Sequence, residues 1–144
     1  MAGFSLLRDP NTTVFRTVRV ASQAYTFGDA VHQDRTSDAT DVVPATASSN
    51  TQNIYAVAQE TVASTATTLL VCLVNPDQEW QVDSTNDAVN NHRYQRMLLT
   101  DKATVNNTGT DNTTDEAVVT QLGYTGATTA KKLIVKFNMA AVAA

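Results

Sequence analysis

Residues that could act as nucleophiles or general bases are few in this chain of 144 residues. The sequence has one cysteine, Cys72, and two histidines, His32 and His92. Cys72 lies inside the apolar run Leu69–Val74, which favours a buried thiol over a reactive one. Neither histidine lies in a motif typical of hydrolases, P-loop proteins or zinc proteases. Catalytic groups can assemble from distant positions in a chain, but nothing here indicates such a set, and we expect no enzymatic activity.

Carboxylates gather in two polar segments that we expect to be loops. They are Asp34, Asp38 and Asp41 in the first segment and Asp111, Asp115 and Glu116 in the second. Oxygen ligands on loops suit Ca²⁺, but neither segment has the alternating spacing and the glycine of an EF-hand. Aspartate in a threonine-rich loop is a common turn former. We therefore expect neither a metal site nor a cofactor.

Aromatic side chains are the remaining candidates for ligand contact, because a flat ring can stack on a sugar. The tyrosines are Tyr25, Tyr55, Tyr94 and Tyr124. Trp80 alternates with Val82 on one face of a predicted strand, which favours packing in the core. A sugar-stacking role for one tyrosine stays open, with no motif behind it.

Charge and hydropathy exclude two classes of partner. The formal net charge is −4 and the isoelectric point is about 4.9, whereas binding to nucleic acid needs a basic face that neutralises phosphates. No apolar run is longer than the six residues of 69–74, far fewer than the ~20 residues of a membrane-spanning helix. We expect no nucleic acid and no membrane among the partners.

Composition favours β-structure. Threonine and valine supply 23 and 17 residues, 40 of the 144 in total, and β-branched side chains fit a pleated sheet better than a helix. Many short strands separated by turns imply a small antiparallel β-barrel or β-sandwich. The predicted strands are residues 12–20, 42–44, 54–59, 67–74, 79–83, 117–124 and 133–138. Residues 24–32 are predicted as a turn and a short strand, 94–100 as a strand or an extended segment, and 101–115 as a long loop. A helix competes with the strand at 54–59, because Ile54, Val57, Ala58 and Val62 also fit a helical period.

The chain divides into an extended N-terminal arm, residues 1–11, a single β domain, residues 12–139, and a short apolar tail, residues 140–144. The arm carries Phe4, Leu6 and Leu7 before Pro10. Either these side chains order on a partner, or they pack on their own domain, and the sequence leaves both open. On the partner interpretation, deleting residues 1–11 should abolish binding and leave the domain folded.

The first predicted strand breaks its own alternation. Val14, Val18 and Val20 share one face, yet Arg16 falls on that face and Phe15 on the other. This irregularity is typical of an edge strand or an interface. Our candidate contact residues are therefore those outside any alternating core pattern: Phe4, Leu6, Leu7, Arg8, Phe15 and Arg16.

The order of strand phrases resembles the capsid decoration (cement) proteins of tailed bacteriophages over roughly residues 12 to 138. The phrases are YTFGDAV (25–31), VVPA (42–45), IYAVA (54–58), the strand 69–73, NPDQEWQV (75–82), LGYTGA (122–127) and KKLIVKFN (131–138). These are strand phrases and not site signatures. The loop 104–115 departs from the pattern.

The resemblance implies a structural protein on the exterior of the virion, made in the cytoplasm of a bacterial host. It implies binding to the major capsid protein, self-assembly as a homotrimer, bridging of neighbouring capsid subunits, and no catalytic residues. Two alternatives remain: a glycan- or receptor-binding module such as a head fibre or adhesin domain, and a tail-tube or head-completion subunit.

Overall fold

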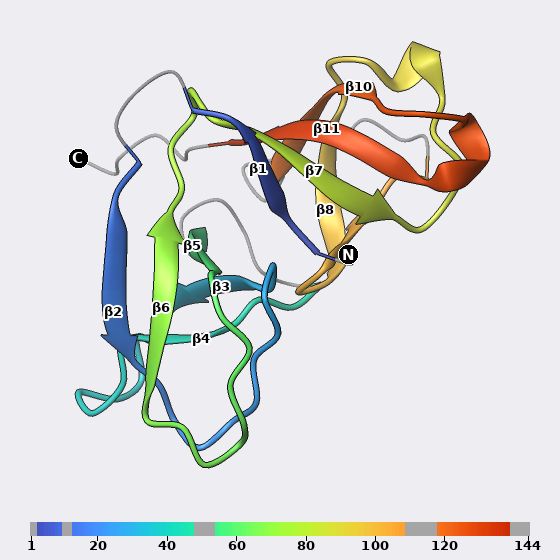
Figure 1. Ribbon diagram of the computed structural model, residues 1–144. Coiled ribbons are helices and arrows are strands. Elements are labelled where there is room, and N and C mark those ends of the chain that lie inside the picture. The colour runs from blue at the N-terminus through green and yellow to red at the C-terminus, as the bar shows by residue number, and fades with distance from the viewer. Residues whose placement is uncertain (1–2, 10–12, 48–53, 109–117, 139–144) are drawn as a thin grey trace.

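The computed structural model describes residues 3–9, 13–47, 54–108 and 118–138, and every structural statement below concerns these residues. The fold is all-β, as the composition predicts, and consists of a six-stranded sheet and a five-stranded barrel. Figure 1 shows the six-stranded sheet at the upper right and the barrel at the lower left. No helix in the described ranges is long and apolar enough to span a membrane.

The six-stranded sheet is built mainly from the second half of the chain. Its order is β1 (Ser5–Arg8), β7 (Glu79–Ser84), β11 (Lys132–Phe137), β10 (Val119–Tyr124), β8 (Arg96–Asp101) and β9 (Thr104–Asn106). Neighbouring strands are antiparallel, and β9 also pairs in parallel with the end of β7. The strand β9 corrects our expectation of an uninterrupted loop over 101–115.

The five-stranded barrel contains the β-branched strands of the first half. Its order is β2 (Phe15–Arg19), β6 (Thr68–Leu73), β5 (Ile54–Ala58), β3 (Ala30–Gln33) and β4 (Val42–Pro44). A parallel bridge between Val20 and Val42 closes the barrel. Two short 3₁₀ turns, Asn90–His92 and Thr128–Ala130, join strands of the other sheet.

Two hydrophobic cores lie on opposite faces of β5 and β6. Ala56, Ala58, Leu69 and Val71 face the barrel interior with Val18, Val20, Tyr25, Val31 and Val42. Val57 and Cys72, on the other faces of the same strands, join the core beneath the six-stranded sheet. Strands buried on both sides read as continuous apolar runs, which explains the run at 69–74. The helix alternative at 54–59 is wrong, because β5 needs both faces for packing.

Residues 3–8 are an integral part of the larger sheet. Ser5 and Leu6 of β1 pair with Gln81 and Trp80 of β7. The Phe4 ring is fully buried against Phe137, with the ring centroids 4.9 Å apart. The described part of the expected arm therefore packs on its own domain, and Phe4 is a core residue. Deleting residues 1–11 would remove a strand and a core aromatic, so the structure leads us to expect that this deletion destabilises the domain.

A glycine makes the entry of Phe4 into the core sterically feasible. Gly3 has φ +86°, and a Cβ atom there would lie 2.7 Å from the carbonyl oxygen of Gly28. The same oxygen accepts the backbone N–H of Phe4 at 2.8 Å. Only glycine combines this left-handed backbone with such a close approach, so the turn before β1 is anchored against residue 28.

Candidate functional site

The residues considered for catalysis do not come together. Cys72 is buried, and burial raises the pKa of its thiol, which disfavours the nucleophilic thiolate. The His32 ring nitrogen Nδ1 lies 3.1 Å from the carbonyl oxygen of Gln33. His92 lies in the 3₁₀ turn of the other sheet. Within the described ranges, no group of three His, Cys, Asp or Glu side chains is placed to hold a metal ion.

The first carboxylate segment is organised by Asp34. Its Oδ1 atom accepts hydrogen bonds from the Thr36 amide at 2.9 Å and the Thr36 hydroxyl at 2.8 Å, and its Oδ2 atom accepts one from the Thr40 hydroxyl. These bonds, the Thr40 hydroxyl first, lower the pKa of Asp34 to about 2. Asp34 thus serves as a turn former for its own loop. Asp111, Asp115 and Glu116 of the second segment lie outside the described residues.

The Asp34 loop makes the free energy of unfolding depend on pH in the acidic range. A carboxyl group whose pKa is lowered on folding stabilises the native state above its unfolded pKa, and this contribution disappears as the pH falls from about 4 to about 2. An Asp34→Asn variant should therefore lose less stability than the unchanged protein over that interval. Urea unfolding at pH 2, 3, 4 and 5 measures the difference. Parallel curves for the two proteins would show that Asp34 carries no such linkage.

Four exposed apolar side chains lie on β1 and around the start of β2, namely Leu6, Leu7, Val14 and Phe15. We name this set the N-terminal edge. These four side chains are 36%, 49%, 48% and 56% exposed. They account for four of the six exposed large hydrophobic side chains in the described chain, the others being Val89 and Tyr94. Clustered exposed apolar residues mark interaction surfaces, whereas isolated ones do not.

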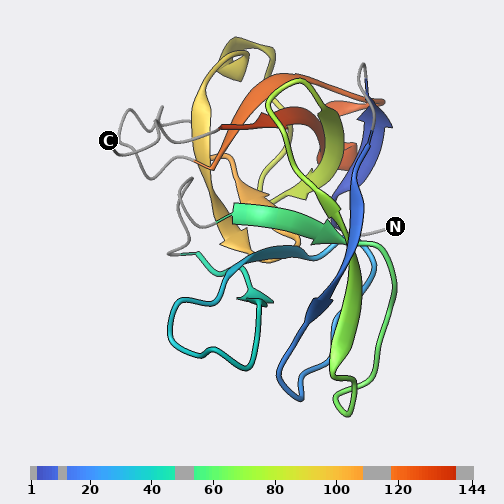
Figure 2. The same cartoon turned by 90° about the vertical axis from the view of Figure 1, so that its left-hand side faces the viewer.

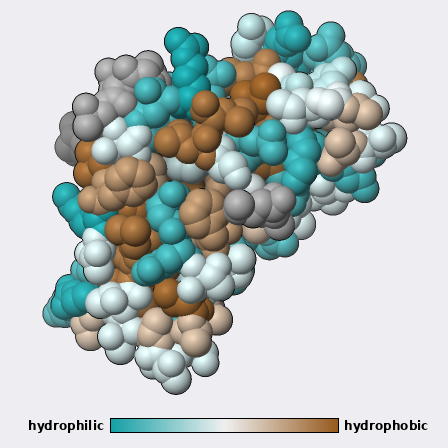
Figure 3. Space-filling view, in the orientation of Figure 1, coloured by the Kyte–Doolittle hydropathy of each residue, from teal (hydrophilic) through white to brown (hydrophobic). Residues whose placement is uncertain are grey.

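The N-terminal edge runs along open strands of both sheets. β1 is the terminal strand of the six-stranded sheet, and β2 is the end of the barrel strand order. Figures 1 and 2 show the two strands following one another along the same side of the molecule. In Figure 3, brown and tan surface gathers over β1 and near the start of β2. Of the two alternatives predicted for this strand, an edge or an interface, the pairing order favours the edge, although the Val20–Val42 bridge joins the end of β2 to β4.

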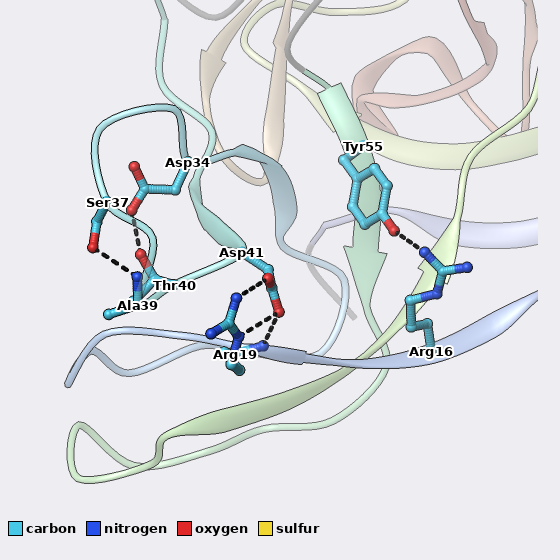
Figure 4. A network of polar contacts seen from close by, with 8 residues as sticks. All are labelled: Arg16, Arg19, Asp34, Ser37, Ala39, Thr40, Asp41 and Tyr55. Carbon is cyan, nitrogen blue, oxygen red and sulfur yellow. Dashed lines mark hydrogen bonds and ion pairs between the residues drawn. The ribbon is translucent and has the colours of Figure 1, made fainter.

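The two candidate arginines have different surroundings. Arg8 is exposed and forms an ion pair with Glu79, with 3.1 Å between nitrogen and oxygen. Arg16 shares the inward face of β2 with Val18, and its guanidinium donates a hydrogen bond of 2.7 Å to the Tyr55 hydroxyl (Figure 4). Phe4, by contrast, has no exposed surface with which to contact a partner. This corrects its assignment as a contact residue.

Arg16 borders a pocket of about 230 Å³ that we name the barrel-mouth pocket, lined by Arg16, Thr17, Val18, Gln33, Asp41 and Tyr55. Below this pocket the barrel is closed by Arg19, which donates to both carboxylate oxygens of Asp41 through its side chain and to Oδ2 through its amide. Figure 4 shows this closure beside the Arg16–Tyr55 pair. The Arg19 bonds hold the pKa of Asp41 below its usual range, so the Asp41 charge is already balanced.

A second, larger pocket lies near residues 45–47 and 100–104 and has a volume of about 410 Å³. Its lining is mostly alanine and threonine. The charge of Lys102 is directed to the buried Asp29, with Nζ 3.2 Å from Oδ2. Although the volume suits a small molecule, the one carboxylate of the lining, Asp101, accepts the amide of Ala103 at 2.8 Å as part of its own turn.

The aromatic candidates separate into buried and exposed residues. Tyr25 is 1% exposed and belongs to the barrel core, which excludes it as a sugar-stacking platform. Trp80 and Val82 are both buried, as their alternation predicts. Tyr94 is 70% exposed and has φ +67°, an unusual conformation for a bulky residue. Its amide donates to the carbonyl oxygen of Gln121 at 2.6 Å.

The sequence predicts three of the four side chains of the N-terminal edge, Leu6, Leu7 and Phe15, but not the barrel-mouth pocket. The placement of Val14 on the core face is wrong, because its side chain is 48% exposed. Arg16 was noticed only as a break in alternation, and its partner Tyr55 lies 39 positions further along the chain. The break was a usable signal, because an arginine on the apolar face of a strand needs an opening or a polar partner.

Comparison with known proteins gives no family for this chain. No protein-family model matches the sequence. No curated protein matches it either.

Proposed function

We propose that this protein is a structural component of a phage virion that binds the outer surface of the head. In this role it stabilises the capsid lattice by bridging neighbouring major capsid subunits. The N-terminal edge is the observation that carries the proposal, because apolar residues on the open strands of two sheets form a surface suited to docking on protein. The resemblance of the strand phrases to capsid decoration proteins supplies the kind of partner.

The remaining properties are compatible with a protein displayed at high copy number. A net charge of −4 favours solubility and keeps free copies apart. Assembly as a homotrimer would link three weak contacts, and linkage raises the effective concentration of each contact once the first has formed. Weak single sites are therefore sufficient for firm attachment to a repeating surface.

The test is a comparison of phage heads with and without this protein. Cryo-imaging should show additional density on the outside of heads that carry it, and these heads should survive heating that opens bare ones. Heads of equal heat resistance, or density confined to the tail, would contradict the proposal. Tubes or rings formed by the purified protein alone would favour a tail-tube or head-completion subunit.

A glycan-binding module is the second candidate, and Tyr94 is the observation that favours it. An exposed aromatic ring on a constrained backbone can present a flat face to a sugar. Glycan-array binding that is lost in a Tyr94→Ala variant would support this function. Absence of glycan binding, together with binding to heads, would leave the structural function.

A further inference from the structure

The free edge of β2 has hydrogen-bonding groups that point away from the barrel wall. Leu73 donates its amide to the Val14 carbonyl, and Val20 donates to the Thr67 carbonyl, so residues 14 and 20 face β6. In an antiparallel pair successive residues alternate in direction, and Phe15, Thr17 and Arg19 therefore face away from β6. Arg19 confirms this direction, because its amide and its carbonyl both bind Asp41.

Phe15 and Thr17 differ from Arg19 in what lies beside them. In the described chain β6 is the one strand that pairs along β2, and the bridge from Val20 to Val42 closes the barrel only below Arg19. The outward backbone groups of Phe15 and Thr17 thus have no neighbouring strand among the described residues, and Thr17 lines the barrel-mouth pocket. Such an edge accepts an extended peptide as an additional strand.

The pocket beside this edge has the size and charge for one acidic side chain. Its volume of about 230 Å³ is smaller than the ~300–1,000 Å³ of small-molecule sites. Asp41 is paired with Arg19, whereas Arg16 donates to the neutral Tyr55 phenol and has no ion pair among the described residues. The charge of Arg16 acts on Asp41 only at longer range and after the Arg19 bonds. One hydrogen bond to Tyr55 leaves other guanidinium donors of Arg16 available for a carboxylate.

We propose that the barrel-mouth pocket binds an extended segment of a partner protein, which adds as a strand to the free edge of β2 and places an acidic side chain beside Arg16. The exposed Phe15 ring then covers the outer face of the added segment. This inference rests on the proposed function for the identity of the partner, a capsid subunit, but the binding chemistry can be tested without the capsid.

The experiment is a titration of the ¹⁵N-labelled full chain with the peptide acetyl-Thr-Val-Glu-Val-Thr-amide, followed by NMR. We expect shifts at the amides of Phe15 and Thr17 and at the Arg16 side chain. Replacing the glutamate of the peptide with glutamine should weaken binding at least tenfold, because the charge-assisted bonds are lost. Methylation of one peptide nitrogen that faces β2 removes a backbone hydrogen-bond donor, and it should weaken peptide binding by a similar factor.

Variants of the protein distinguish binding at Arg16 from a general electrostatic attraction of the acidic peptide. Arg16→Gln should weaken binding at least tenfold, Arg16→Lys should retain part of it, and Arg93→Gln is the matched control. Arg93 is exposed and bonds to the Asn90 side chain, so its loss changes net charge equally and should leave binding unchanged. If Arg16→Gln lowers the melting temperature, two comparisons still test whether an acidic side chain binds beside Arg16. They are the Arg16→Lys variant and the glutamate peptide against the glutamine peptide.

Several outcomes would overturn the inference. They are equal binding of the glutamate and glutamine peptides, shifts spread away from β2, and an equal effect of Arg93→Gln. Phe15 and Thr17 shifts that follow protein concentration without peptide would identify a second copy as the occupant. If the protein binds heads but does not bind the peptide, the inference is contradicted and the proposed function is not. Peptide binding without head binding would sink the proposed function and leave the pocket chemistry standing.

Discussion

Replacing Phe4 with alanine is expected to lower the free energy of unfolding by about 3–5 kcal/mol, the usual cost of emptying a buried aromatic site. Phe4 is fully buried and contacts Phe137, whose ring also packs edge-on against Trp80 with 5.9 Å between centroids. The cavity would open beneath β1 and β7, where rigid strands cannot collapse to fill it. Because domains are stable by only about 5–15 kcal/mol, this one change removes a large part of the total.

Urea unfolding followed by Trp80 fluorescence measures the effect, since Trp80 is the one tryptophan of the chain. Leu7→Ala is the control, because Leu7 lies three residues away and is half exposed. It should cost less than about 1 kcal/mol. A Phe4→Ala protein as stable as the control would mean that Phe4 does not belong to the core.

The double variant Leu7→Ser, Phe15→Ser is expected to fold normally and to bind phage heads about 30-fold more weakly per copy. Both side chains are about half exposed, so each loses roughly 1 kcal/mol of apolar burial at an interface. A total of about 2 kcal/mol corresponds to this factor. Sedimentation of heads with labelled protein over a range of concentrations gives the dissociation constant.

Val89→Ser, Tyr94→Ser is the matched control, because it removes the two exposed apolar side chains that lie outside the N-terminal edge. We expect this protein to bind heads as the unchanged protein does. If the control variant loses binding and the N-terminal edge variant keeps it, then the surface around Tyr94 is the contact surface. The melting temperatures of both variants establish that neither result reflects unfolding.

Local pattern was sufficient to predict the β-class and most strands. β4 is found at the predicted residues 42–44, and the strands predicted at 67–74 and 79–83 appear as β6 and β7. These strands follow from β-branched residues and turn residues that act locally. The buried state of Cys72 and Trp80 also follows, since each lies in a clear apolar run or alternation.

Two strands, β1 and β9, were not predicted from the sequence because their pairing with β7 is long-range. β1 has only four residues, and its partner β7 begins 71 positions after β1 ends, at Glu79. A short apolar segment so far from its partner looks the same whether it docks on another molecule or on its own sheet. β9 was missed for a related reason, because three residues near a polar loop carry little periodicity and β9 is held by both β7 and β8.

The candidate site was predicted in part. Exposed apolar residues at positions 6, 7 and 15 follow from broken alternation, and the structure places them on open strands. The Arg16–Tyr55 contact depends on how the barrel brings β2 and β5 around a common interior, and no local spacing encodes that closure. Phe4 and Leu6 are two residues apart, yet one is buried and the other exposed.

β1 and β2 pair with strands that follow them by more than 45 positions in the chain. β2 pairs with residues 68–72 and β1 with residues 79–81, so both wait several seconds at a synthesis rate of about 5–20 residues per second. During that interval the nascent chain exposes Phe4, Leu7 and Phe15 together, and slow pairing of distant strands favours aggregation. The tight turn at Gly3 has to form for β1 to dock, so a larger residue at position 3 would prolong this exposure.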